Sequence, residues 1–177
     1  MRLFVALDLP GDVRAALAGW ADSAAPAAVR RVPVQNLHLT LAFLGSRDED
    51  DARAAGGLLA QVVRPLGTQS TAGALWLPRR RPGVLTVALR ADDGLAALQA
   101  DLVASLEHAI GLGAEHRPFR PHVTVGRVLR GARVDPRRAL DPPVPELLFR
   151  APALTLYRSH TGASGARYEP VARVGLD

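Results

Sequence analysis

The feature that most constrains this chain is a four-residue pattern that occurs twice. His38-Leu39-Thr40-Leu41 is repeated as His122-Val123-Thr124-Val125, 84 positions later (122 − 38) in a chain of 177 residues. Each copy lies in an apolar, β-branched run that is typical of a strand. Residues i and i+2 of a strand face the same side, so each copy presents an imidazole beside a hydroxyl. Two such pairs facing each other across a groove would surround a phosphate.

The recurrence of the pattern matters more than either copy. Threonine is common in strands, and a lone histidine beside apolar residues is usually structural. In both copies, however, the alternate positions are apolar while the His and Thr positions share one polar face. Polar groups left unsatisfied in a core cost about 1–3 kcal/mol each. We therefore interpret His38, Thr40, His122 and Thr124 as a functional site lining a polar groove.

Composition excludes several chemistries. The sequence contains no cysteine, which excludes disulfides, thiolate nucleophiles and cysteine-ligated metals. All 22 basic residues are arginine, so no Walker lysine, Schiff base or lysine–nucleotide intermediate can form. No apolar run reaches the roughly 20 residues of a membrane span, and Asp8 and Asp12 interrupt the early apolar stretch. We expect a cytoplasmic protein that does not contact membranes.

The charge balance favours an anionic partner. The net charge is +5 and the pI is near 11.0, as in many proteins that bind nucleic acids or nucleotides. Aromatic residues make up only 5% of the chain, so no RRM-like stacking platform is expected. A run of three arginines, Arg79–Arg81, lies between two expected strands. We interpret it as a solvated hairpin tip in preference to an RNA contact.

Hydrophobic periodicity predicts a mixed chain of strands and helices. The clearest helix covers 92–110, where five apolar residues fall at helical spacing. No linker rich in Pro, Gly or Ser divides the chain, so one folding unit is expected, large enough to bury about 70% of the surface that the unfolded chain exposes. Each half carries one copy of the histidine pattern, as two lobes related by a pseudo-twofold axis would. The expected strands cover 2–9, 29–34, 37–44, 71–77, 84–90, 123–128, 147–157 and 167–174, the other helices cover 10–24 and 46–63, and a turn covers 159–165.

Other catalytic patterns are absent from the sequence. There is no His-Glu-x-x-His, no Gly-x-Ser-x-Gly and no complete Gly-x-Gly-x-x-Gly. His38 and His122 could bind a metal, but each copy supplies a hydroxyl where a hard-cation site would have a carboxylate. His108 is expected at the surface near a helix end. His116 and His160 are expected in loops that border the groove.

The residues resemble a known family. The doubled motif, the opening strand Arg2–Ala6, the Arg120-Pro121 context of the second copy and the closing segment Ser159–Tyr168 resemble the two-histidine phosphoesterase superfamily. Within it, the chain is most similar to the bacterial and archaeal RNA 2′,3′-cyclic phosphodiesterases, also called 2′-5′ RNA ligases. The resemblance implies an α+β, bilobal fold over residues 1–177, with two pseudo-twofold-related lobes, an antiparallel sheet and flanking helices in each, and a central groove.

The resemblance also implies a reaction and roles for individual residues. An RNA 2′,3′-cyclic phosphate end is hydrolysed to a 2′-phosphomonoester without metal, cofactor or ATP, and the same site can run 2′-5′ RNA ligation. His38 is then the proton donor and His122 the proton acceptor. Thr40, Thr124 and Arg127 bind the phosphate. RNA, with tRNA fragments among the candidates, is the expected partner, and no obligate protein partner is inferred.

Three alternatives stay open at this stage. The same fold could act on small nucleotides such as ADP-ribose cyclic phosphate or 2′-5′ oligoadenylate, because the loops that line the groove select the substrate. A protein that binds RNA ends without catalysis would keep its affinity after loss of both histidines. A metal-dependent hydrolase would lose its activity with a chelator.

Overall fold

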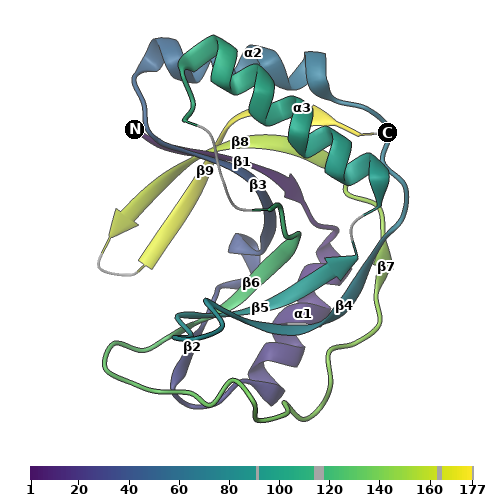
Figure 1. The fold of residues 1–177 in the computed structure, drawn as a ribbon, viewed down its shortest axis with the longest axis vertical. Coiled ribbons are helices and arrows are strands. Elements are labelled where there is room, and N and C mark those ends of the chain that lie inside the picture. The colour runs from purple at the N-terminus through teal and green to yellow at the C-terminus, as the bar shows by residue number, and fades with distance from the viewer. Residues whose placement is uncertain (91, 114–117, 163–164, 177) are drawn as a thin grey trace.

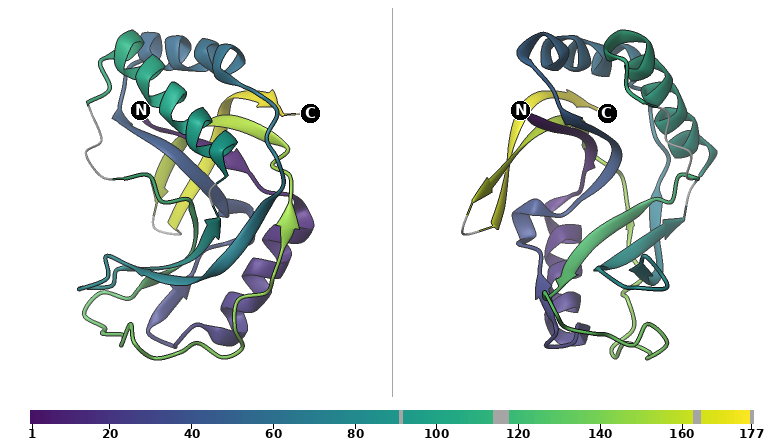
Figure 2. Two further views of the ribbon diagram at one scale, coloured as in Figure 1. Left: turned by 45° about the vertical axis from the view of Figure 1, so that its right-hand side comes forward. Right: turned by 60° about the vertical axis from the view of Figure 1, so that its left-hand side comes forward.

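The strands form one antiparallel sheet that curls into a half-barrel, with the helices outside it (Figures 1 and 2). The computed structural model describes residues 1–90, 92–113, 118–162 and 165–176. Strand order is β7-β4-β5-β6-β3-β1-β8-β9, with β2 paired to β6. This path of eight strands has two halves of four, β2 is a ninth strand beside β6, and the two histidine strands, β3 and β6, lie next to each other at the centre.

Each half of the sheet is built from strands that are distant in sequence. One half contains β3 (His38–Ser46), β1 (Arg2–Asp8), β8 (Ala153–Gly162) and β9 (Gly165–Gly175). The other contains β6 (His122–Val128), β5 (Val84–Arg90), β4 (Gln69–Leu77) and β7 (Leu148–Phe149), together with β2 (Val29–Arg31). Between the halves, β3 and β6 share a single registered pair, Leu39 with Val123.

The helices divide between the two halves. α2 (Glu49–Val62) and α3 (Asp93–Ile110) pack against each other; α2 also packs on β8 and β9, and α3 on β3. α1 (Gly11–Ala24) packs on β2, on β6 and on a short 3₁₀ turn at Val34–Asn36. A continuous hydrophobic core, dominated by Leu, Val and Ala, fills the space between helices and sheet. The concave face of the sheet is left uncovered by helices.

Helix α3 shows how local sequence fixes the ends of an element. The Asp92 side chain accepts a 2.7 Å hydrogen bond from the Leu95 amide, which caps the N-terminus. Gly111 ends the helix at φ 60°, in the left-handed conformation that glycine adopts without steric cost. The five periodic apolar residues are all buried: Leu95, Leu98, Leu102, Leu106 and Ile110. No helix in the described part of the chain is both long and apolar enough to cross a membrane.

The α+β class and the two antiparallel halves predicted from the sequence are confirmed, and three boundaries are corrected. The halves are joined in one continuous sheet rather than two separate sheets. The predicted strand 147–157 is two strands, because Pro152 lacks the amide that would continue the ladder. The predicted turn 159–165 is wrong, because β8 runs to Gly162 and pairs with β9. α2 starts after Asp48, whose side chain caps it, since β3 continues to Ser46.

Candidate active site

The two copies of the histidine pattern meet on the concave face of the sheet. Leu39 and Val123, paired across the joint, are 1% and 0% exposed and point into the core. The alternate residues therefore point to the opposite, concave face, and all four are half-buried: His38, Thr40, His122 and Thr124. Continuing the antiparallel register by one residue sets His38 beside Thr124 and Thr40 beside His122. The structure thus brings the four predicted residues together.

Both imidazoles are held by the same backbone contact. The Nδ1 of His38 lies 2.7 Å from the carbonyl oxygen of Asn36, and the Nδ1 of His122 lies 2.7 Å from that of Arg120. Because a carbonyl oxygen only accepts, Nδ1 carries a proton in both rings. Nε2 is then the atom of each ring that is free to exchange a proton. The His38 Nε2 lies 3.0 Å from the Thr40 hydroxyl.

A β-bulge follows the threonine in each copy. On β3, Ala6 pairs with Thr40 and Val5 with Ala42, so Leu41 is the extra residue. On β6, Thr86 pairs with Thr124 and Leu85 with Gly126, so Val125 is the extra residue. A bulge changes which face the following residues point to. The fifth residue after each histidine is consequently exposed: Phe43 on β3 and Arg127 on β6.

Gly126, in the second bulge, allows a close approach between strands. A Cβ at this position would lie 2.4 Å from Cγ1 of Val29 on β2. Only glycine therefore lets β2 and β5 pack on both sides of β6 at this point. The equivalent residue on β3 is Ala42, which is 7% exposed. Small residues at both positions keep the bulges packed against the core.

Aromatic rings surround His38. Phe4 stacks on the imidazole with ring centroids 4.8 Å apart, and Tyr168 meets it edge-on at 5.3 Å. Tyr157 also stacks on Phe4, at 5.4 Å, and its ring centroid lies 6.4 Å from that of the imidazole. Phe43 lies next to Phe4 at 6.3 Å, and its side chain is 75% exposed. These rings fix the plane of the imidazole, and Phe43 offers an open aromatic surface close to it.

A carboxylate lies beside His38 on the neighbouring strand. Asp8 pairs with His38 in the β1–β3 register, and its side chain is only 16% exposed. Its oxygens accept hydrogen bonds from the Tyr157 hydroxyl at 2.7 Å, the Thr155 hydroxyl at 3.1 Å and Arg173 Nε at 3.0 Å. Burial, followed by the hydrogen bond to Asp8, raises the pKa of Tyr157 to about 12. The phenol therefore stays a proton-bearing donor to Asp8.

The surroundings of His38 lower its pKa below the ordinary value of 6.5. Burial is the largest cause, because it disfavours the charged imidazolium. The positive charge of Arg127 and the charge of His122 act in the same direction. The Asn36 hydrogen bond and the negative charge of Asp8 oppose them and raise the pKa. The pKa of His38 is thus coupled to the charges of three neighbours: Asp8, Arg127 and His122.

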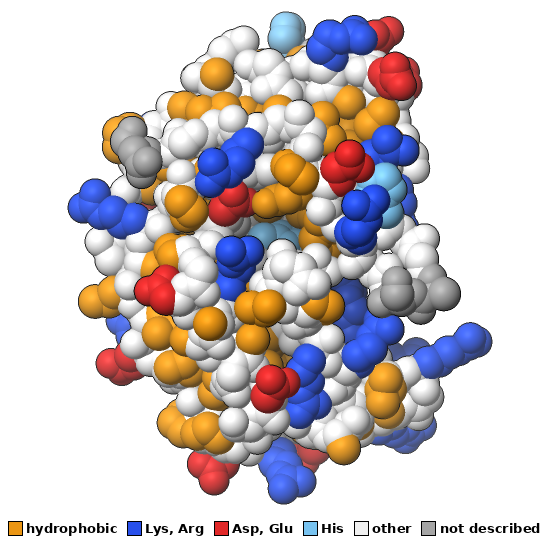
Figure 3. All heavy atoms as spheres, turned by 180° about the vertical axis from the view of Figure 1, so that it is seen from behind, with side chains coloured by type: hydrophobic (Ala, Val, Ile, Leu, Met, Phe, Trp, Pro, Cys, Tyr) orange, Lys and Arg blue, Asp and Glu red, His pale blue; other side chains and the backbone are white. Residues whose placement is uncertain are grey.

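The surroundings of His122 are basic instead of aromatic. Its partner in the β5–β6 register is Ala88, where the first copy has Asp8. Arg120 and Arg127 flank it on its own strand segment, and both are exposed. Figure 3 shows a histidine surface recessed near the middle of one face, with arginine side chains around it. The two copies share a backbone geometry but not a chemical environment.

Some residues of this site were missed in the sequence analysis, and other histidines lie elsewhere. Asp8, Phe4 and Tyr157 could have been suspected only from their place in polar or aromatic positions of strands, since strand pairing is not visible in one sequence. His160 lies on β8, not in a loop, and pairs with Glu169 at 2.7 Å. His108 is exposed on α3, as predicted. The expectation for His116 lies outside the described residues.

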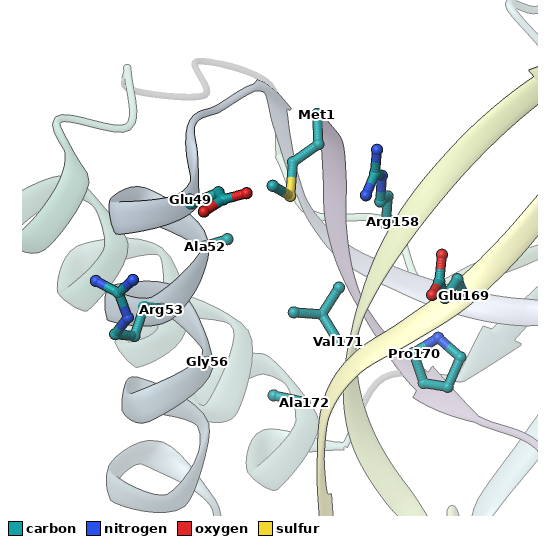
Figure 4. A pocket seen from close by; sticks show the side chains of 10 residues that line it. All are labelled: Met1, Glu49, Ala52, Arg53, Gly56, Arg158, Glu169, Pro170, Val171 and Ala172. Atoms are coloured by element: carbon teal, nitrogen blue, oxygen red, sulfur yellow. The ribbon is translucent and has the colours of Figure 1, made fainter.

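A second hollow lies away from the histidines. It is bounded by α2 and β9 and lined by both charged and apolar side chains (Figure 4). Glu169 lines it, whereas the adjacent Tyr168 contacts His38, so it opens on the opposite face of the sheet. Within the described ranges, no three His, Asp or Glu side chains are grouped as metal ligands would be. The predicted acid–base groups lie at β3 and β6, away from this hollow.

Comparison with known proteins agrees with this geometry. Residues 9–163 match the model of the 2′-5′ RNA ligase superfamily. The chain is 34% identical to an RNA 2′,3′-cyclic phosphodiesterase of Escherichia coli, over 99% of this chain and 96% of the relative. It is 32% identical to one of Thermus thermophilus, over 99% and 90%. The crystal structure of E. coli LigT complexed with 3′-AMP has a TM-score of 0.77 and 30% identity, over 99% and 97% of the two chains.

Proposed function

Since the chain belongs to the 2′-5′ RNA ligase superfamily, we propose that it hydrolyses RNA 2′,3′-cyclic phosphate ends to 2′-phosphomonoesters. The observation that carries the proposal is the pair of imidazoles on adjacent strands, each with Nδ1 bound to a backbone carbonyl, so that Nε2 is the ring atom left to exchange a proton. Full-length relatives that carry this activity in their names support the choice of substrate.

In-line attack on phosphorus needs a base and an acid on opposite sides of the phosphate. His122 Nε2 takes the proton of the attacking water, and the new P–O bond forms. The bond from phosphorus to the ribose 3′ oxygen breaks, and His38 Nε2 gives that oxygen its proton. The 2′-phosphate stays on the ribose. Two neighbouring strands supply the two groups, so no movement of the backbone is needed to bring them to one phosphate.

The lowered pKa of His38 bears on its role as proton donor. In the free protein the neutral ring is favoured. A bound phosphate adds negative charge beside the ring and so raises the pKa of His38 relative to the free protein. The donor form is then populated when the substrate is in place. Asp8, half-buried beside His38, favours the same form.

The remaining groups of the site stabilise charge on the phosphate. The hydroxyls of Thr40 and Thr124 donate to the two non-bridging oxygens, where negative charge gathers in the transition state. Arg127, on the same face of β6, adds a fixed positive charge. Phe43, exposed beside the aromatic cluster, offers a stacking surface to a base next to the cyclic phosphate.

The same chemistry accepts a second nucleophile. If an RNA 5′-hydroxyl attacks instead of water, the 3′ oxygen leaves as before and the product is a 2′-5′ linkage. The reaction draws on the strain of the five-membered cyclic phosphate and needs no adenylylated lysine, which this sequence could not supply. Hydrolysis and ligation then differ only in which hydroxyl reaches the His122 side.

The test is to incubate the protein with an RNA that ends in a 2′,3′-cyclic phosphate, with EDTA present, and to identify the end group. A 2′-phosphate is expected. A 3′-phosphate, or loss of activity with the chelator, would contradict the assignment of His38 and the metal-independent scheme. Adding an RNA with a 5′-hydroxyl to the same reaction measures ligation.

The proposal includes three broader statements. Residues 1–177 act as a single two-lobed domain, which one cooperative unfolding transition seen by two probes would support. The protein works in the cytoplasm, which cell fractionation tests. Fragments of tRNA are among its substrates, which sequencing of cyclic-phosphate RNA ends in cells with and without the protein tests.

A further inference from the structure

Three consecutive arginines form the connection between β4 and β5. Arg79, Arg80 and Arg81, here called the arginine tip, are all exposed. The base of the connection is fastened on two sides, because the Gly83 amide donates to the Leu77 carbonyl and the Val128 amide donates to the Gly83 carbonyl, both at 2.9 Å. The connection projects from the edge of the molecule (Figure 2, left). The tip is thus held in place at its base, on β6, the strand that carries His122.

Further exposed arginines lie on the strands between the arginine tip and the site. Arg127 pairs in register with Val84, at the start of β5, and with Arg30 on β2. Both Arg30 and Arg127 are exposed, and the charge of Arg127 acts on His38. Figure 3 shows arginine side chains gathered along one side of the face that carries the recessed histidine surface. One end of this row of charges therefore lies at the candidate site.

Among the described residues, these arginines form no ion pair with a carboxylate, unlike other arginines of the protein. Arg31, Arg47, Arg53, Arg64 and Arg173 each form an ion pair with an Asp. In the part of the chain that the structure describes, none of Arg30, Arg127 and the arginine tip does so. The sequence explains this, because positions 52–91 and 116–134 contain no Asp or Glu. Each guanidinium group can donate two parallel hydrogen bonds to one phosphate, so a row of arginines without ion-pair partners suits binding to an RNA backbone.

Resting on the function proposed above, we propose that the arginine tip binds the RNA backbone several nucleotides away from the cyclic phosphate. The five residue steps from His122 to Arg127 span about 17 Å of strand, and the tip lies farther on. At about 3.4 Å per nucleotide of a stacked strand, the tip meets the phosphates some five to eight nucleotides from the end. The preferred substrate is then an oligonucleotide, and a single cyclic nucleotide leaves the tip unused.

The test compares two triple variants of equal charge. One replaces the arginine tip, Arg79→Ala, Arg80→Ala and Arg81→Ala. The control replaces Arg53→Ala, Arg64→Ala and Arg150→Ala, three exposed or half-buried arginines outside the row. Binding of a ten-nucleotide RNA with a 3′-phosphate is measured by fluorescence anisotropy over a range of salt concentrations. The tip variant should bind about tenfold more weakly at low salt, and its salt slope should fall by about 0.7 for each phosphate that the tip no longer neutralises.

Turnover gives the second readout. The ratio of kcat/KM for a cyclic-phosphate decamer to that for a nucleoside 2′,3′-cyclic phosphate should fall about tenfold in the tip variant and stay at the wild-type value in the control. Equal decreases in both variants, or an unchanged ratio and unchanged RNA affinity, would overturn the proposal. A wild-type protein that shows tip-dependent binding but no turnover would instead overturn the proposed function and leave this inference standing.

Discussion

The two histidine copies are alike in backbone and unlike in surroundings. In both, the ring binds the carbonyl two residues before it, a threonine follows at i+2, and a bulge comes next. Around His38 the neighbours are Phe4, Tyr168 and the half-buried Asp8, whereas around His122 they are Ala88 and arginines. The same backbone geometry thus presents both rings on one face of the sheet, and the neighbours of His38 lower its pKa. The reaction proposed above uses the two rings in unlike roles, one as proton donor and one as proton acceptor.

Removing each histidine tests the difference most strongly. His38→Ala and His122→Ala should each lower kcat on an RNA 2′,3′-cyclic phosphate by about 10³-fold, since each loses one proton transfer. An aryl phosphodiester, whose phenolate leaves without a proton, should restore much of the activity to His38→Ala and little to His122→Ala. Initial rates on both substrates provide the measurement. Equal rescue of the two variants would show that the donor and acceptor roles are misassigned.

Removing the hydroxyls tests the symmetry of the two copies. Thr40→Val and Thr124→Val keep the shape of the side chain and should each cost about 10²-fold in kcat, the scale of a missing donor to a developing charge. Thr40 also contacts His38 Nε2, so its variant should in addition shift the pH profile. Rates within a factor of two of wild type in either variant would contradict a hydrogen bond to the phosphate.

Removing the carboxylate tests the asymmetry between Asp8 and Ala88. Asp8→Asn deletes a charge that raises the pKa of His38, so that pKa falls further and the fraction of protonated donor shrinks. We expect kcat/KM above neutral pH to fall about tenfold and the high-pH limb of the profile to move to lower pH.

Two variants control for structural damage at Asp8. Asp8→Glu keeps the charge and should recover the wild-type profile. Glu169→Gln removes an exposed carboxylate on the other face, which pairs with His160, and should leave the profile in place. An unchanged pH profile of kcat/KM in Asp8→Asn would contradict a role for the negative charge. Asp8 would then contribute through packing alone.

The smallest expected effect is a shift in the pKa of His38. NMR of the free protein should give a pKa below 6.5 for this ring, because burial disfavours its charged form. Saturation with inorganic phosphate should raise that value, since the anion favours the imidazolium. A free-protein value of 6.5 or above, or a decrease with phosphate, would contradict the donor model.

The motif residues could be predicted from the sequence, but the side chains that surround them in the fold could not. Alternation of polar and apolar residues is a local property, so the four-residue motif was enough to predict that His38 and Thr40 share a face. The contact between Asp8 and His38 depends on the β1–β3 register, and the stacking of Phe4 and Tyr157 depends on pairing across 153 positions (157 − 4). The bulges at Leu41 and Val125 were also invisible, because an extra residue in one strand is defined only by its partner.

The single registered pair between β3 and β6 has a consequence for how such a site can be tuned. No long ladder of hydrogen bonds fixes the spacing of β3 and β6. The buried contact of Leu39 with Val123, on the core side of the sheet, therefore sets that spacing. A methylene added or removed in that contact would alter the gap between the two imidazoles while leaving every polar group intact. The reaction rate can therefore be changed by the volume of buried apolar side chains, without a change in any polar residue of the site.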